Sequence, residues 1–105
     1  MIYISGPMSG YEDFNRPAFA RAAAALRELG HQVVSPPEVT DSTDWIEAMR
    51  ADIKALCDCT AIAMLPGWTQ SRGAQIELRI ARELGMQELY IGWTTCGRIQ
   101  LVEMK

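Results

Sequence analysis

Short strand-like segments alternate along this chain with longer segments of helical periodicity, and this alternation restricts the fold more than any other feature. The predicted strands are residues 2–5, 32–35, 61–65 and 88–92, with a short edge strand at 98–102. The third predicted strand, residues 61–65, is a continuous apolar run, which is typical of a parallel strand covered on both faces. Strand–helix–strand units are joined by right-handed crossovers. We therefore expect a single flavodoxin-like (Rossmann-like) α/β domain with a four- to five-stranded parallel sheet and helices on both faces.

Residues that favour helix ends mark where two of the helices begin and end. Asn15 and Pro17 suit the start of a helix, because Asn caps and Pro is tolerated in the first turn, and Gly30 would end it. Asp44, followed three residues later by Glu47, resembles a capping box ahead of the next helix.

Length and charge narrow the class of protein. A chain of 105 residues suits one domain, which we assign to residues 1–105. The formal net charge of -3 comes with no basic stripe, so we expect no nucleic-acid partner. No apolar run approaches the roughly 20 residues that cross a bilayer, and residues 1–5 predict a strand rather than a signal peptide. We expect a cytoplasmic protein with no membrane partner.

Cysteine and histidine chemistry is not favoured. Cys57, Cys59 and Cys96 are an odd number without a C-x-x-C spacing, and His31 is the single histidine of the chain. A structural metal, a disulfide framework and a Ser-His or Cys-His pair are therefore not expected. Carboxylates are the better candidates for chemistry, and no cofactor is expected.

Glu77 is a lone carboxylate on the apolar side of a predicted helix that runs from an N-cap at Ser71 to Leu84. The residues about one and two turns away are small or apolar: Gly73, Ala74, Ile80, Ala81 and Leu84. A carboxylate is rarely placed there without a partner or a task. The pattern favours two roles equally, a functional one and a structural one in which Glu77 caps a loop or pairs with a distant arginine.

Asp52 and Tyr3 are two further candidates. Asp52 lies beside the predicted buried stripe of its helix, formed by Trp45, Met49, Ile53 and Leu56. From this spacing alone, an aspartate at the solvent edge that pairs with Arg50 or Lys54 is favoured over a site residue. Tyr3 alternates with Ile2 and Ile4, so the pattern favours a core or cross-sheet tyrosine.

Two loops are expected to face each other across a crevice. In open parallel sheets, ligands bind beyond the carboxyl ends of the strands, where the strand order reverses. There the Gly6–Gly10 loop, whose backbone amides can face a ligand, would lie opposite the Pro66–Ser71 loop. Glu77 would lie on the helix leaving this crevice, and Asp52 on the helix before the third strand.

Three motifs carry a resemblance to a known group of proteins. They are Tyr3–Gly10, Leu65–Trp68 and Ser71-x-Gly73-Ala74-x-x-Glu77. Over residues 1 to 92, the chain resembles small phage and bacterial proteins of the nucleoside 2-deoxyribosyltransferase-like superfamily. It is more distantly similar to the deoxyribosyltransferases themselves and to the deoxynucleoside 5'-monophosphate N-glycosidases.

The resemblance implies roles for the matching residues. Glu77 would be the nucleophile that attacks the anomeric carbon, Asp52 would act near the base and sugar, and Tyr3 would orient the nucleophile. Ser71 would bind phosphate, and the implied substrate-binding set is Gly6, Pro7, Met8, Gly67, Trp68, Ser71 and Gly73. The residue types suit this chemistry, because a carboxylate can trap the oxocarbenium-like state of N-glycosidic cleavage as a glycosyl-enzyme.

The chain departs from these enzymes at two positions. Thr60 stands where relatives commonly carry an aspartate, and Ser9 stands where the monophosphate hydrolases carry an arginine. Two main hypotheses follow: a nucleoside or nucleotide N-glycosidase or 2-deoxyribosyltransferase acting through Glu77, and a non-catalytic phage or bacterial protein that binds and sequesters a nucleotide signal. A third is an interaction domain whose site has decayed. Trp68 in the site loop fits a homodimer in each case.

Overall fold

The computed structural model describes residues 1–103 and has a five-stranded sheet at its centre, in the order β2-β1-β3-β4-β5. The strands are β1 (Ile2–Ser5), β2 (Val33–Val34), β3 (Ala61–Met64), β4 (Gln87–Trp93) and β5 (Ile99–Glu103). The helices are α1 (Arg16–Glu28), α2 (Pro36–Val39), α3 (Trp45–Leu56) and α4 (Arg72–Glu83), with short 3-10 turns η1 (Glu12–Asn15) and η2 (Trp68–Gln70).

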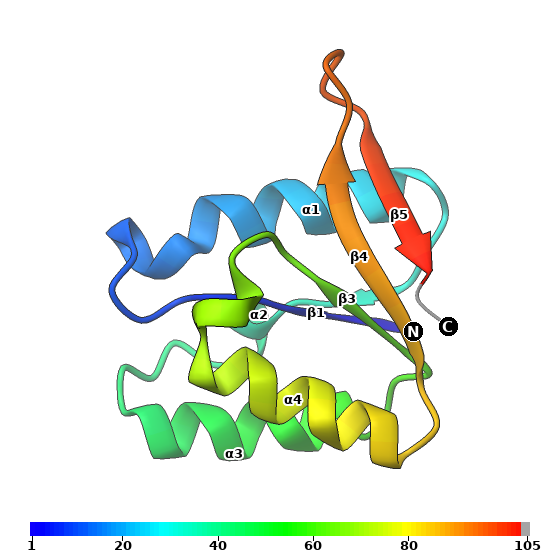
Figure 1. Cartoon of the computed structure of the whole chain (residues 1–105). Coiled ribbons are helices and arrows are strands. Elements are labelled where there is room, and N and C mark those ends of the chain that lie inside the picture. The colour runs from blue at the N-terminus through cyan, green and yellow to red at the C-terminus, as the bar shows by residue number, and fades with distance from the viewer. Residues whose placement is uncertain (104–105) are drawn as a thin grey trace.

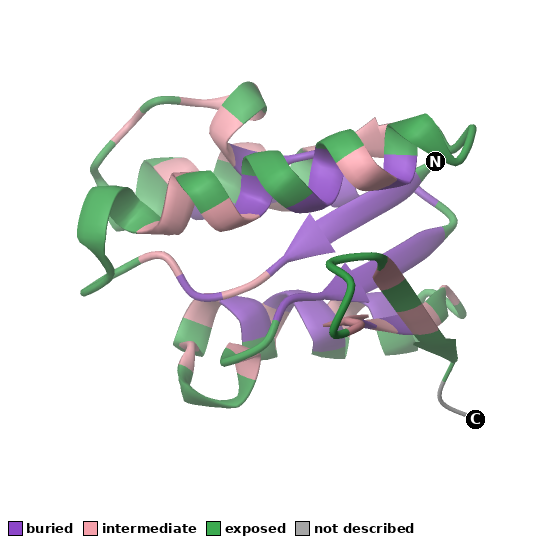
Figure 2. Cartoon of the chain, turned by 90° about the horizontal axis from the view of Figure 1, so that it is seen from above, coloured by how far each residue is buried: buried purple, intermediate pink, exposed green. Residues whose placement is uncertain are grey.

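Helices cover both faces of the sheet, as predicted, with α1 on one side and α3 and α4 on the other (Figure 1). Alternation along β1 separates the two halves of the core, because successive side chains of a strand point to opposite faces. Ile2 and Ile4 pack with Phe19 and Leu26 of α1, whereas Tyr3 packs with apolar residues of α3 and α4. Figure 2 shows that the central strands are buried while the helices expose their outer sides.

The sheet is mixed, so the prediction of a purely parallel sheet is wrong for its last strand. The pairs β1–β2, β1–β3 and β3–β4 are parallel, but β5 runs antiparallel to β4. Only residues 94–98 connect β4 to β5, and a parallel crossover needs a dozen residues or more. The short connection closes as a hairpin, in which the Thr94 amide donates to the Arg98 carbonyl at 2.8 Å.

Two predicted helix caps are confirmed and a third is wrong. The side chain of Asp44 accepts from the Glu47 amide at 2.9 Å, and Ser71 Oγ accepts from the Ala74 amide at 3.2 Å. Asn15 does not cap α1 with its side chain, because its backbone is left-handed at φ 60°. Its side-chain amide instead donates to the Pro7 carbonyl at 2.9 Å, which ties the loop after β1 to the start of α1.

None of the helices within residues 1–103 is long and apolar enough to cross a membrane.

Candidate functional site

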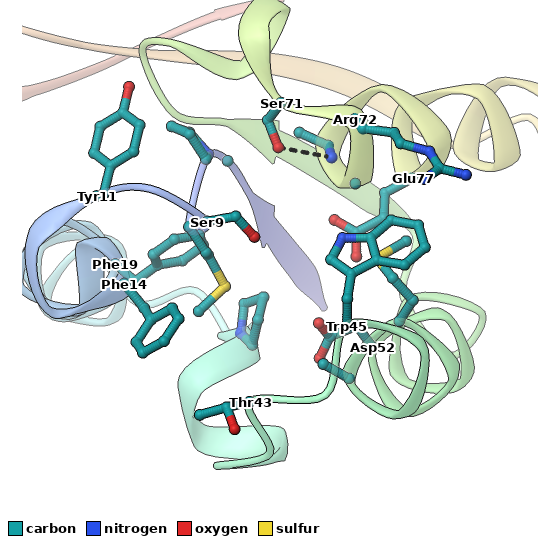
Figure 3. Close-up of a pocket in the computed structure, with 18 of the residues that line it drawn as sticks. Ser9, Tyr11, Phe14, Phe19, Thr43, Trp45, Asp52, Ser71, Arg72 and Glu77 are labelled. Atoms are coloured by element: carbon teal, nitrogen blue, oxygen red, sulfur yellow. Dashed lines mark hydrogen bonds between the residues drawn. The ribbon is translucent and has the colours of Figure 1, made fainter.

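A cavity of about 410 Å³ opens beyond the carboxyl ends of β1 and β3 (Figure 3). One wall is the loop after β1, together with Tyr11, Phe14 and Phe19, and the opposite wall is formed by the amino-terminal parts of α3 and α4. The residues that line it include Gly6, Pro7, Met8, Ser9, Trp45, Met49, Asp52, Ser71, Arg72, Gly73 and Glu77. The first loop and the two carboxylates predicted to meet at a crevice therefore meet here, and Gln70 and Ser71 are the part of the second loop that joins them.

Glu77 is buried, with 5% of its surface exposed, on the side of α4 that packs against the sheet. Its two carboxylate oxygens are held by two hydroxyl groups of β1. Tyr3 donates to Oε2 at 2.8 Å, and Ser5 donates to Oε1 at 2.6 Å. Glu77 thus neither caps a loop nor pairs with an arginine within the described chain, so the structural alternative does not account for it.

Burial raises the pKa of Glu77 from an ordinary 4.5 to about 7. The hydrogen bonds from Ser5 and Tyr3 act in the opposite direction, because they stabilise the charged form, while the charge of Asp52 raises the pKa further. Burial and the charge of Glu77 also raise the pKa of Tyr3 well above its usual value. Tyr3 therefore keeps its proton and acts as a donor.

Asp52 faces the same cavity from α3 and is 5% exposed. The interpretation that it lies at the solvent edge and pairs with Arg50 or Lys54 is wrong, because Asp52 is buried and forms no ion pair within residues 1–103. Burial raises its pKa from 3.8 to about 7. In the same part of the chain, its buried Oδ1 atom has no hydrogen-bond partner. Asp52 can therefore receive a hydrogen bond from a ligand, or donate one when protonated.

Gly67 and Trp68 lie outside the cavity lining, so the structure does not bring these two predicted substrate-binding residues to the cavity. The Trp68 ring packs on Tyr90, with the ring centroids 5.8 Å apart, and belongs to the core on the α4 side. Gly67 has a left-handed backbone at φ 90°, and a Cβ there would lie 2.8 Å from the Tyr11 hydroxyl. This glycine therefore lets Tyr11, which does line the cavity, pack against the second loop.

Gly73 lines the cavity and has a packing role as well. A Cβ at this position would lie 3.2 Å from the Met49 sulfur and 3.8 Å from Nε1 of Trp45. The missing side chain lets the first turns of α3 and α4 approach each other. Across the same contact, the Arg72 guanidinium stacks on the Trp45 indole at 4.6 Å from the ring centroid. Both of these side chains line the cavity (Figure 3).

Ser5, which holds the Glu77 carboxylate, is a site residue that the sequence analysis missed, as are the cavity-lining residues Tyr11 and Arg72. The signal was present, because Ser5 follows Tyr3 by two residues on a strand and so shares its face.

The two positions at which the chain departs from the enzymes lie in different parts of the structure. Ser9 lines the cavity, whereas Thr60 precedes β3 at the opposite end of the sheet, where its hydroxyl donates to the Met1 carbonyl at 3.4 Å.

The chemistry of the site is that of two carboxyl groups. Within residues 1–103, no group of three or more His, Cys, Asp and Glu side chains is placed to hold a metal ion. The cavity combines a hydrogen-bonded carboxylate, a second carboxyl group with a free oxygen, and apolar and aromatic walls. Such a set can supply a nucleophile or base and an acid.

Fold and site together define a class, namely an α/β domain with two buried carboxyl groups at a cavity beyond one edge of its sheet. The model of the family DUF4406, described as a domain of unknown function, matches residues 1–90, and the chain belongs to this family. The match ends within β4, so β5 lies outside it. No curated protein matches the chain.

Proposed function

We propose that the protein cleaves the N-glycosidic bond of a nucleoside or nucleotide, as a hydrolase or a 2-deoxyribosyltransferase, with Glu77 as the nucleophile. The observation that carries this proposal is the Glu77 carboxylate, which is buried at a cavity, held by Tyr3 and Ser5, and accompanied by Asp52. A carboxylate fixed in this way suits attack on an anomeric carbon. The proposal places the chain in the nucleoside 2-deoxyribosyltransferase-like superfamily that its motifs resemble.

The arrangement of the strands supports the same proposal. The parallel strands have the order β2-β1-β3-β4, and β5 adds an antiparallel edge. The order of the parallel strands supports the assignment of a flavodoxin-like domain that we propose here. In such sheets the ligand site lies where the order reverses, between β1 and β3. The cavity lies there, and its volume of about 410 Å³ is within the range of sites for small molecules. The aromatic side chains of its walls suit stacking against a base.

In the first step, one carboxylate oxygen of Glu77 forms a bond to C1' of the sugar. The bond between C1' and the base nitrogen breaks, and its electron pair leaves with the base. The protonated carboxyl group of Asp52 gives its proton to the departing base. The products are a free neutral base, an ionised Asp52 and a glycosyl ester of Glu77.

In the second step, the oxygen of a water molecule attacks C1' and the ester bond to Glu77 breaks. The electron pair of that bond returns to the Glu77 carboxylate, and the proton of the water passes to Asp52. Both side chains are then restored. A second base in the place of the water, attacking through a ring nitrogen and losing its proton to Asp52, gives transfer instead of hydrolysis.

The hydrogen bonds of the two carboxyl groups support this division of roles. The pKa of each is about 7, so near neutral pH either group can be protonated or ionised. Two hydroxyls donate to Glu77 and stabilise its charged form, whereas Oδ1 of Asp52 receives no such bond within the described chain. The state with an ionised Glu77 and a protonated Asp52 is therefore favoured, as the first step requires.

The test is an incubation of the protein with a panel of nucleosides and nucleoside 5'-monophosphates, with free base and retained ligand measured by mass spectrometry. We expect base release by the wild type and none by Glu77→Gln, which keeps the volume of the side chain. The control is Glu83→Gln, the same change at an exposed position of the same helix, and it should retain activity. Retained nucleotide without any base release would refute catalysis and favour the nucleotide-binding alternative.

A further inference from the structure

Ser5 is a fully buried polar residue in a strand whose other members are Ile2, Tyr3 and Ile4. The residue opposite it on β3 is the apolar Met64, which is also buried. The Ser5 hydroxyl donates to Oε1 of Glu77 at 2.6 Å, and the two residues are 72 positions apart in the chain. Because Ser5 has no exposed surface and does not line the cavity, its hydroxyl acts on Glu77 and not on a bound molecule.

We propose that Ser5 is a positioning residue, whose hydroxyl fixes the orientation of the Glu77 carboxylate and keeps it ionised in a cavity that disfavours charge. This inference rests on the proposed function for its catalytic meaning, but its physical content can be measured without a substrate. It assigns to Ser5 a task separate from that of Tyr3, because the two hydroxyls hold different oxygens of the same carboxylate.

The geometry of the two hydrogen bonds explains why one donor is not enough. The terminal torsion of a glutamate side chain is broad, so a carboxylate held at one oxygen can turn about that contact. Tyr3 holds Oε2 and Ser5 holds Oε1, and together they define the plane of the group. Both donors come from one face of β1, two residues apart, so a rigid central strand sets their separation.

The charges around Glu77 show why the second donor affects ionisation. The titratable groups that act on Glu77 are Tyr3 from β1 and Asp52 from α3, and no cation pairs with it within the described chain. Burial and the charge of Asp52 both favour the protonated form, and only the Tyr3 and Ser5 hydroxyls oppose them. Loss of the Ser5 hydroxyl would leave Oε1 buried without this donor, so the protonated form would become more favourable.

The experiment is a pH titration of the Glu77 side-chain carboxyl carbon by ¹³C NMR in the wild type, Ser5→Ala and Ser35→Ala. Ser35 is the matched control, because it is also a buried serine, 2% exposed, and does not line the cavity. We expect the pKa of Glu77 to rise by about one pH unit in Ser5→Ala, the size of one hydrogen bond to a charged group, and to stay unchanged in Ser35→Ala. Thermal melting in the same buffers checks that each variant is folded.

An unchanged pKa of Glu77 in a folded Ser5→Ala protein would overturn the inference, as would an equal rise in Ser35→Ala. If Ser5→Ala does not fold, Ser5→Cys replaces it, since the thiol has a similar volume and is a weak donor. That variant should give a smaller rise, and a pKa equal to that of the wild type would also overturn the inference.

The kinetic readout separates the two proposals. Where the wild type releases base, Ser5→Ala should move the acidic limb of its pH–rate profile upward, with about tenfold lower activity below the limb and near-normal activity above it. Activity lowered equally at every pH would overturn the role of Ser5 in ionisation. If the wild type releases no base from any substrate, the proposed function fails, while the NMR titration still decides the role of Ser5.

Discussion

Replacing Glu77 by glutamine should stabilise the folded protein at alkaline pH and change its stability little at acid pH. Burial raises the pKa of Glu77 from an ordinary 4.5 to about 7, so between these values the folded state keeps a proton that the unfolded state has released. The folded state is then favoured less as the pH rises through this window, and the loss is complete above about pH 7. Glutamine carries no charge and removes this dependence.

The magnitude follows from the same two values. The difference between 4.5 and about 7, at about 1.4 kcal/mol for each pH unit, corresponds to about 3 kcal/mol of unfolding free energy. Glutamine has nearly the shape of glutamate, and the hydroxyls of Tyr3 and Ser5 can each accept as well as donate, so its amide keeps partners. For a domain of this length, that gain corresponds to a melting temperature higher by roughly 10–20 °C at pH 8.

The assay is urea unfolding of the wild type, Glu77→Gln and Glu83→Gln at pH 4, 6 and 8, followed by the fluorescence of the three tryptophans. Asp52 titrates in all three proteins, so comparing them largely removes its contribution. We expect Glu77→Gln to exceed the wild type by about 3 kcal/mol at pH 8 and by almost nothing at pH 4, with no such trend in the exposed control. A difference that does not change with pH would refute the reasoning.

Two further predictions concern the acid and the packing at the cavity. Asp52→Asn should slow base release by roughly 10²–10⁴-fold and remove the alkaline limb of the pH–rate profile, because an amide cannot supply the proton; a rate equal to wild type would contradict this role. Gly6→Ala should destabilise the fold by about 1–3 kcal/mol in urea unfolding, since the new methyl would lie 2.7 Å from Cβ of Leu65. Gly92→Ala, where a Cβ meets nothing within 4 Å, is the control and should be close to neutral.

Several features of the fold could be predicted because they are encoded by residues close in sequence. The helix caps at Asp44 and Ser71 depend on a side chain and an amide three residues apart. The position of Glu77 on the apolar side of α4 follows from helical spacing alone. The antiparallel direction of β5 could also have been predicted, because the connection after β4 is long enough only for a hairpin.

The role of Asn15 could not be predicted from the residues next to it in the sequence. Asparagine favours the first position before a helix, but the loop after β1 folds back so that this side chain reaches the Pro7 carbonyl. That contact occupies the side chain that would cap the helix, and the backbone of residues 13–15 is left-handed. The outcome depends on where the loop lies in the fold, which no pattern within one helix can report.

The sequence by itself determined that Glu77 is an unpaired acid on an apolar surface, and it left the reason open. Only the tertiary structure shows why the acid is there. The partners of Glu77 are the hydroxyls of Tyr3 and Ser5, which are 74 and 72 residues away in the sequence and lie on the strand that α4 covers. The tertiary structure also buried Asp52 beside the same cavity, against the local expectation of an exposed ion pair. Burial and long-range hydrogen bonds arise only when β1, α3 and α4 pack together, so the two carboxyl groups become a site only in the folded chain.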